Sequence, residues 1–479
     1  MFQKFLSWIK GVIFKMLHIS DAKRALQVDV AISIPMQTAI NLWYELFTNQ
    51  APWLDDITPS LGLPAAIAGE IARLTTVELE SDVTGSPRAD YLHQELRPVL
   101  ASLRNNMEIA AAGGGLVFKP YVDGEHIAVD CVPAWRFLPT AFNSRKEVTG
   151  AVFVEQVTKG RTYYTRMEHH QLTDEGYTIR NLAFTSQSKD ALGTPCGLGQ
   201  VDEWADLEPE MTIRYKDGTV PEGVLFAYFR IPFANVVDTE SPLGVSVYSR
   251  AVELIKDADR QYGRILWEFE GSELAVDASQ GALDVSDRDG KPVKLPHRNK
   301  RLFRQLAIDQ GDHGDLYKVF NPEIRDTSLF NGLDKILKRI EFNCNLAYGT
   351  LSDPQNVDKT AEEIRSSKQR SYSAICEVQT ALQGALEHLL WVMDLYATLY
   401  KLAPRGEYKA NFTWGDGILQ DVDLEYARRM QLADRGYLRP EKVLSWYFHI
   451  SEEEAARDYM PAQEQAPPLF GDGDEGGAE

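Results

Sequence analysis

The chain has 479 residues, which at roughly 150 residues per domain predicts about three structural units. Hydrophobic residues make up 44% and charged residues 25%, a composition that excludes a fibrous or wholly disordered chain. The 70 acidic residues outnumber the 50 lysines and arginines, so the formal charge is −20. Because proteins that hold DNA tightly through its phosphates are normally basic, this charge disfavours strong non-specific DNA binding.

Four cysteines, Cys131, Cys196, Cys344 and Cys376, lie far apart in the sequence. Their spacing predicts neither a zinc site nor a disulfide framework. Such sparse cysteine is typical of a reducing compartment, so we expect folding in the cytosol. No apolar run approaches the roughly 20 residues that span a bilayer, and we therefore expect a soluble protein without a membrane partner.

Residues 1–20 place apolar side chains at helical spacing with lysines between them. The interspersed lysines and the lack of a small-residue cleavage site argue against a signal peptide. Two interpretations stay open, a helix on a membrane surface and an arm that packs on its own or a neighbouring subunit. We favour the arm. The apolar positions are Phe2, Phe5, Ile9, Val12, Ile13 and Met16.

The first half of the chain predicts a mixed α+β region. Residues 21–110 have helical patterning, with Pro and Asp breaks at 51–56 and 81–87. The glycines Gly113 to Gly115 follow, and then an Asp123-Gly124 step between two strand-like runs predicts a hairpin. Further strands are expected at 150–157, 161–168, 177–184 and 223–229.

The second half predicts three long helices. The first begins at Ser241-Pro242, where serine can cap the helix and proline suits its first turn, and it continues to Gly271. The second covers 328–348. The third begins at Thr360, which forms a capping box with Glu363, and continues to about residue 402. These lengths exceed those of usual globular helices.

Two segments between these helices lack helical periodicity. Residues 274–326 carry turn pairs at Asp289-Gly290 and Asn321-Pro322 and predict a small β-containing module. Residues 349–359 are polar and rich in helix breakers, so they predict a loop. The tail predicts a helix from Asp421 to Arg435, two shorter helices after it, and a disordered end rich in Pro, Gly and acid.

The sequence contains no residue pattern typical of a catalytic site. Gly113 to Gly115 lack the Gly-Lys-Ser/Thr of a phosphate-binding loop. The contiguous Glu168-His169-His170 lacks the i, i+4 histidine spacing of helical zinc ligands, and no Gly-x-Ser-x-Gly elbow occurs. We therefore expect no enzyme, no catalytic residue, no metal and no cofactor.

Seven basic residues gather between positions 288 and 304, where Asp289 is the one acidic residue. One interpretation is a solvated basic surface. The other is a docking patch for an acidic partner or for DNA phosphates. The residues are Arg288, Lys291, Lys294, Arg298, Lys300, Arg301 and Arg304.

Taken in order, several segments resemble the portal proteins of long-tailed double-stranded DNA bacteriophages. The most specific lies at 226–259, with Ser241-Pro242-Leu243-Gly244-Val245-Ser246 and Asp257 to Asp259. The resemblance covers roughly residues 30–455. The other segments are Gly113 to Tyr121, Cys131 to Pro139, Tyr163 to His169, Thr360 to Ile364, and Asp421 to Gln431 with Gly436.

The resemblance implies a portal fold that assembles as a ring, typically a dodecamer, at one vertex of the virion capsid after assembly in the host cytoplasm. It implies that duplex DNA passes through the ring without sequence readout during packaging and ejection. It also implies contacts with terminase, with major capsid and scaffolding proteins, and with a head-tail connector or adaptor. The implied regions are a wing at 1–240 with its arm at 1–20, stem helices at 241–273 and 327–349, a clip at 274–326, a tunnel loop at 350–360, a long wing helix and return at 361–419, and a crown with a disordered acidic tail at 420–479.

By the same resemblance, the tunnel loop would present Asp353, Gln355, Asn356 and Lys359 to DNA, and the seven basic residues of the clip would dock the partner proteins. An acidic ring repels DNA phosphates, so the duplex could move past its wall without sticking. Two alternatives remain, another structural virion component such as a neck or baseplate protein, and a DNA-processing enzyme of the packaging apparatus. The enzyme is disfavoured because the sequence has neither a phosphate-binding loop nor an acidic metal cluster.

Overall fold

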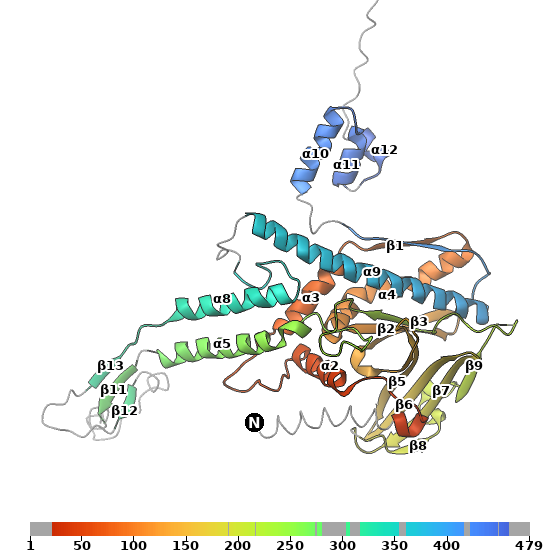
Figure 1. Ribbon diagram of the computed structural model, residues 1–479, viewed down its shortest axis with the longest axis horizontal. Coiled ribbons are helices and arrows are strands. Elements are labelled where there is room, and N and C mark those ends of the chain that lie inside the picture. The colour runs from red at the N-terminus through yellow and green to blue at the C-terminus, as the bar shows by residue number, and fades with distance from the viewer. Residues whose placement is uncertain are drawn as a thin grey trace, which may run out of the picture. The chain divides into compact units, whose positions relative to one another are not determined.

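The computed structural model has an α+β fold (Figure 1). The chain divides into two compact units, residues 1–415 and 416–479, which are described separately. The structure describes residues 22–189, 191–215, 217–273, 275–279, 303–306, 317–353, 361–415, 422–448 and 450–458. The predicted arm at 1–20 lies outside these ranges.

Three helices open the larger unit: α2 (Ile34–Phe47), α3 (Leu63–Thr76) and α4 (Pro87–Gly113). Ser33 and Ser86 cap α2 and α4, and each is followed by a proline in the first turn. The predicted helical character of residues 21–110 is confirmed for most of this stretch. Strand β1 (Glu80–Thr84) was not expected, and it forms because β14 (Lys409–Thr413) pairs with it from far along the chain.

Two antiparallel sheets follow the helices. The predicted hairpin at Asp123-Gly124 is confirmed as β2 (Gly115–Asp123) and β3 (His126–Pro133), which pair in one sheet of order β10-β2-β3. The larger sheet has the order β4-β5-β6-β7-β8, with β9 also paired to β7. The remaining strands are β4 (Phe137–Phe142), β5 (Val148–Lys159), β6 (Thr162–Thr173), β7 (Gly176–Ser186), β8 (Thr194–Cys196), β9 (Glu210–Ile213) and β10 (Ala227–Arg230).

A close backbone contact joins α4 to the segment before the first long helix. Gly114 has φ +88°, and a Cβ there would lie 2.7 Å from the carbonyl oxygen of Gly244. Val247 N donates to Ala111 O at 3.0 Å. This contact holds residues 243–248 against the core, where Leu243 and Val245 are buried, so the segment is not helical.

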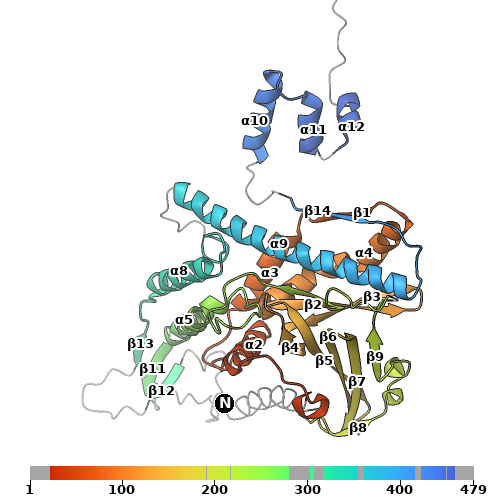
Figure 2. The same ribbon diagram turned by 45° about the vertical axis from the view of Figure 1, so that its right-hand side comes forward.

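The predicted start of the first long helix at Ser241-Pro242 is therefore wrong. That helix, α5, covers Val252–Gly271, and α8 covers Asp326–Asn343. Figures 1 and 2 both show α5 and α8 side by side, and we call them the paired helices. Helix α8 ends before residue 348 because the chain turns at Asn345, whose φ is +57°.

The predicted β-containing module is confirmed for the residues described between the paired helices. Strand β11 (Ala275–Ser279) pairs in parallel with β12 (Phe303–Leu306) and antiparallel with β13 (Tyr317–Phe320). Because β11 directly follows α5 and β13 directly precedes α8, the module lies at one end of the paired helices (Figure 1).

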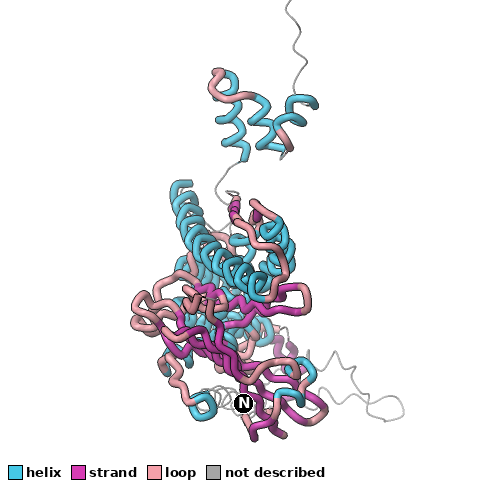
Figure 3. Tube along the Cα trace, turned by 90° about the vertical axis from the view of Figure 1, so that its right-hand side faces the viewer, coloured by secondary structure: helices cyan, strands magenta, loops and turns pink. Residues whose placement is uncertain are grey.

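Helix α9 (Ala361–Leu399) is the longest helix described. It lies over the strands in Figure 3. His388 Nε2 donates to Val224 O at 3.0 Å, and Gln379 Nε2 donates to Thr75 O at 3.4 Å. Buried Arg88 of α4 donates to the carbonyl oxygens of Asp394, Ala403 and Pro404. A cation beside the end of α9 is stabilised by the helix dipole and satisfies carbonyls that helix bonds leave free.

The smaller unit contains α10 (Val422–Asp434), α11 (Pro440–Phe448) and α12 (Glu452–Asp458). The predicted capping box of the last helix is supported by Glu454 N, which donates to Ser451 Oγ at 3.1 Å. The guanidinium of Arg429 lies 4.2 Å from the ring centre of Trp446. Within the described part of the chain, no helix is long and apolar enough to cross a membrane.

Candidate functional site

The structure places only part of the two predicted sites. Asp353 is exposed, and its backbone amide donates to Asp334 Oδ1 at 3.0 Å. Arg304 lies in β12 opposite Asp277 of β11. The other residues of the tunnel loop, Gln355, Asn356 and Lys359, lie outside the described residues. The same holds for Arg288, Lys291, Lys294, Arg298, Lys300 and Arg301, so both sites stay predictions.

The paired helices expose large apolar side chains. Trp267 of α5 is 64% exposed and Phe342 of α8 is 53% exposed, and Leu266, Phe269 and Phe330 are also exposed. Ile265 of α5 and Leu333 of α8 are buried, and the ring centres of Phe269 and Phe330 lie 6.3 Å apart across the two helices. Exposed apolar side chains gathered on one structural element are typical of an interaction surface.

An open hollow of about 570 Å³ lies beside α5. The exposed Ile57 of the loop before α3 forms one side, and Trp267 and Leu329 form apolar parts of the wall. Ionic side chains complete its lining: Arg260, Arg264, Glu268 and Arg325. The hollow therefore combines apolar and charged surface on the outside of the paired helices.

Buried Asp259 fixes α5 to the loop that forms this hollow. Its carboxylate accepts hydrogen bonds at 2.9 Å from Trp53 Nε1 and at 2.9 Å from Leu61 N. Burial raises the pKa of Asp259, and the two hydrogen bonds oppose this effect. Gly263 permits the close approach, since a Cβ there would lie 2.3 Å from Ile57 O. Helix α5 is thus held against the loop between α2 and α3.

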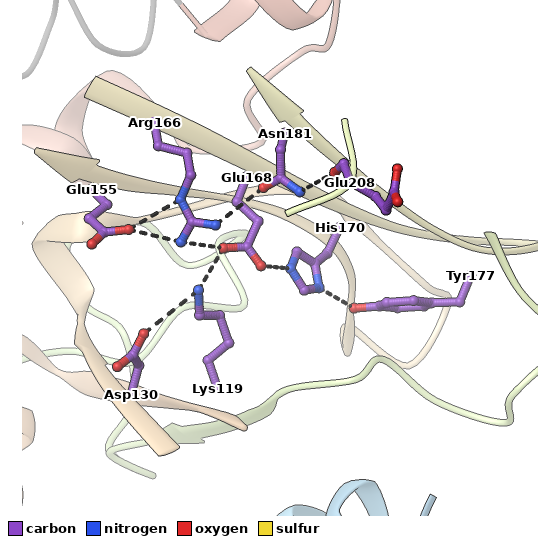
Figure 4. A network of polar contacts seen from close by, with 9 residues as sticks. All are labelled: Lys119, Asp130, Glu155, Arg166, Glu168, His170, Tyr177, Asn181 and Glu208. Carbon is purple, nitrogen blue, oxygen red and sulfur yellow. Dashed lines mark hydrogen bonds and ion pairs between the residues drawn. The ribbon is translucent and has the colours of Figure 1, made fainter. Parts of the chain in front are cut away.

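A second group of polar residues lies between the two sheets (Figure 4). At its centre is Glu168 of β6, which binds Lys119 of β2 at 2.6 Å, Arg166 at 3.1 Å and His170 at 2.7 Å. We call these four residues, with Tyr177, the buried network. Strand alternation places 166, 168 and 170 on one face of β6, which is why they meet.

The charge state of the buried network follows from its contacts. Burial alone would raise the pKa of Glu168, but Lys119, His170 and Arg166 outweigh burial and hold that pKa well below its usual value. Burial lowers the pKa of His170 despite the opposing effect of Glu168. The carboxylate can only accept, so Nε2–H of a neutral His170 donates to it, and Nδ1 accepts from Tyr177 Oη at 2.7 Å.

Further partners surround the buried network. Arg166 donates to Glu155 Oε2 at 2.8 Å and to Asn181 Oδ1 at 3.3 Å, and Asn181 Nδ2 donates to Glu208 O at 2.9 Å (Figure 4). Lys119 also lies 3.8 Å from Asp130. Side chains from β2, β3, β5, β6 and β7 are therefore joined, and the network can fix the two sheets relative to each other.

The sequence singled out Glu168-His169-His170 but did not predict these contacts. His169 points to the opposite face of the strand, 3.5 Å from Thr140 Oγ1, so the two histidines do not act together. Among the described residues, no group of three or more His, Cys, Asp or Glu is arranged to hold a metal ion. Alternation along a strand could have placed Glu168 with His170, but Lys119 lies 49 residues away and has no sequence signal linking it to them.

Comparison with known proteins identifies no family. No family model matches the chain, and no curated protein matches it. Among 56 matching chains of solved structures is one described as the neck of a native GTA particle computed with C12 symmetry. It has 10% sequence identity and a TM-score of 0.39, and the match covers 80% of this chain and 89% of that chain.

Proposed function

We propose that this protein is a bacteriophage portal protein, a non-enzymatic ring at one capsid vertex through which DNA enters during packaging and leaves during ejection. The observation that carries the proposal is the pair of helices α5 and α8, which carries exposed aromatic side chains and ends in a small β module. The order of segments that resembles portal proteins supports the same function.

The exposed aromatic side chains of the paired helices favour a ring. Leaving Trp267, Phe330 and Phe342 in water is unfavourable, and a copy of the same chain can cover them. Repetition of one contact around an axis closes when the rotation between copies divides a full turn, and each copy then covers the next. In this arrangement the paired helices form the stem, β11 to β13 the clip, and the larger unit's sheets the wing.

The acidic charge of the chain fits a DNA conduit. With a formal charge of −20 per subunit, a ring repels the phosphates and DNA can pass without being held. The loop after Asp353 would then supply short polar contacts with the duplex, and the basic segment at 288–304 would dock terminase and then the head-tail connector. Capsid and scaffolding proteins would surround the wing in the virion.

The deciding experiment measures the mass of the purified particle by native mass spectrometry and images the same sample by negative-stain electron microscopy. We expect a closed ring, of about twelve copies by the resemblance, with a central channel wide enough for duplex DNA. A chain that stays monomeric at high concentration would overturn the proposal. A ring whose location in virions is below the capsid vertex would instead identify a neck or baseplate protein.

A matched pair of variants tests whether the paired helices make the ring. We expect Trp267→Glu to shift the particle toward monomers, because the charge is placed where a neighbouring subunit covers the indole. Lys335→Ala, an exposed position of α8 outside the aromatic set, is the control and should assemble normally. Both variants should keep the circular dichroism spectrum of the parent. If both variants assemble equally well, the paired helices do not form the interface between subunits.

A further inference from the structure

The smaller unit buries little apolar surface. Among its described side chains, Val443 of α11 and Ala455 of α12 are fully buried. Chains of less than about 40 residues usually need disulfides, a metal or association with another chain to fold. The three helices lie between residues 422 and 458, residues 416–479 contain no cysteine, and the described residues contain no metal-binding group. Association with another chain is therefore the remaining source of stability.

Large apolar side chains of the same unit are exposed. Leu432 of α10 is 44% exposed, and Phe448 at the end of α11 is also 44% exposed. Tyr437, in the turn after α10, is 80% exposed. Because contact with water is unfavourable for these side chains, the unit gains stability when another protein surface covers them.

Helix α10 presents a basic surface to solvent. Arg428, Leu432 and Arg435 follow each other at intervals of four and three residues, which places them on one side of the helical turn. All three are exposed, and we call them the basic face. An ion pair within the unit joins Lys442 to Glu452 at 3.8 Å, but Arg428 and Arg435 form no ion pair with another described residue.

Helix α12 begins with the opposite charge. Glu452 and Glu454 are exposed in its first turn, and we call them the acidic turn. Negative charge is favourable at the start of a helix because of the helix dipole. The exposed Phe448 precedes Glu452 by four residues. The smaller unit thus carries two exposed surfaces of opposite charge, each with an exposed apolar side chain close by in the sequence.

We propose that the smaller units of neighbouring copies bind each other, with the basic face of one copy against the acidic turn of the next. The proposal rests on the ring proposed above, which gives every copy two neighbours. Because the two surfaces differ, the contact is heterologous, and a closed ring uses both surfaces of every copy. Opposite charge favours this pairing over contact between two like surfaces. DNA phosphates could bind the arginines, but they would not account for the exposed Leu432 or the acidic turn.

Charge reversal in the full-length protein tests each surface. One variant combines Arg428→Glu with Arg435→Glu, and the other combines Glu452→Arg with Glu454→Arg. In rings of either variant we expect hydrogen exchange at the backbone amides of α10 to α12 to be about tenfold or more faster than in parent rings. Exchange in β5 and β6 of the larger unit should not change. Parent exchange rates in both variants would overturn the proposal.

A matched control makes the charge change of the first variant at another place. Lys335→Glu with Arg339→Glu also replaces two exposed bases by two acids, but on α8 of the larger unit. It should leave exchange in the smaller unit at the parent rate. Exchange in α10 to α12 that is as fast in this control as in the first variant would overturn the proposal, because the effect would then follow from net charge alone.

Rings assembled from both reversed variants separate a contact between copies from an effect within one helix. An acid in the last turn of α10, or a base in the first turn of α12, weakens that helix by itself through the helix dipole. This cost remains in every copy when the two variants are expressed together. In an alternating ring, however, every contact again joins opposite charges. We expect native mass spectrometry to find rings with equal numbers of the two variants, and exchange in α10 to α12 severalfold slower than in rings of either variant alone.

The results also distinguish this inference from the portal function. Exchange in mixed rings as fast as in rings of one variant would overturn the contact, while parent rings of normal mass would keep the portal function. Protection that only an added short DNA duplex restores would overturn the contact and identify a nucleic-acid surface. If the parent forms open oligomers and no ring, the portal function fails, and recovery on mixing would still support the contact. A parent that stays monomeric would overturn both.

Discussion

The guanidinium of Arg325 donates two hydrogen bonds to the carboxylate of Glu268, from Nε at 3.0 Å and from Nη2 at 2.7 Å. The backbone amide of Arg325 donates to the same carboxylate at 3.3 Å. Glu268 lies in the last turn of α5, and Arg325 is the residue before α8. The pair therefore joins the paired helices at the end where the chain enters and leaves the β module.

We predict that Arg325→Ala loosens this junction. Without the guanidinium, the ends of α5 and α8 can separate, and protease cleavage between residues 272 and 326 should become severalfold faster. The cleavage rate of Arg325→Lys should lie between those of the parent and of Arg325→Ala, because lysine keeps the charge but cannot donate the two parallel hydrogen bonds of a guanidinium. Lys335→Ala, on the exposed face of α8, should cleave at the rate of the parent. Identical cleavage in Arg325→Ala and the parent would contradict the prediction.

The stability of the contact between Arg325 and Glu268 should also depend on pH. Hydrogen bonds from Arg325 lower the pKa of Glu268 below its usual value of 4.5. A carboxyl with a depressed pKa stabilises the folded chain above 4.5 and loses this contribution as the pH falls through the folded-state pKa. We expect cleavage between 272 and 326 to rise below about pH 4.5 in the parent, measured with an acid-stable protease, and to rise less in Arg325→Ala.

Removal of the lysine in the buried network should destabilise the larger unit. Lys119→Met leaves the Glu168 carboxylate buried without its nearest cation, which costs about 3 kcal/mol or more. Urea unfolding measures this loss. The double variant Lys119→Met with Glu168→Gln should recover part of the stability, because the uncompensated charge is gone. A double variant less stable than the single one would show that Glu168 is not the group left unpaired.

His169 should give the larger unit a second dependence on pH. Burial, with smaller contributions from His170 and Arg180, lowers the pKa of His169 to about 4, so the ring is neutral in the folded chain at neutral pH. The unfolded chain binds a proton near pH 6.5, and stability is therefore lost as the pH falls from about 6.5 to about 4. The free energy of unfolding should fall less steeply over this range in His169→Gln. An unchanged slope would contradict the depressed pKa.

Reversal of charge in the basic segment tests the predicted docking patch. Lys300, Arg301 and Arg304 changed together to Glu should weaken binding of terminase or of the connector by at least an order of magnitude at low salt, because charge complementarity sets the encounter rate. Native mass spectrometry should find rings of normal mass. Reversal of charge at Lys335 and Arg339 on α8, which changes two charges instead of three, is the control. Unchanged binding by the triple variant would show that the basic segment does not dock terminase or the connector.

Local patterns predicted much of the fold. The Asp123-Gly124 turn, the strands at 150–184, α9 and the capped helix after Ser451 all depend on residues close to each other in the sequence. The start of α5 was wrong because Ser241-Pro242 has the residues of a helix start, yet contact between Gly244 and Gly114 holds the chain extended there. A contact between residues so far apart has no local signal.

The candidate site was predicted less well for the same reason. The polar break after α8 was visible in the sequence, but nothing near Glu341 indicated that its carboxylate accepts hydrogen bonds from the amides of Gly349, Leu351 and Ser352. Glu341 lies in a helix pattern that suits a solvated glutamate equally well. Its burial depends on the turn at Asn345 and on the packing of α9, neither of which the local pattern contains.

The pairing of β1 with β14 has a consequence for biosynthesis. Glu80 is opposite Thr413 and Thr84 is opposite Lys409, so the two paired strands come from segments far apart in the sequence (Figure 2). While the ribosome is still making the intervening chain, residues 80–84 lack the partner with which they form a strand, so their backbone amides and carbonyls are open to pairing with other nascent chains. The two-stranded sheet can form only when residue 413 has left the ribosome. Pairing with other nascent chains at residues 80–84 is therefore possible until β14 has been translated.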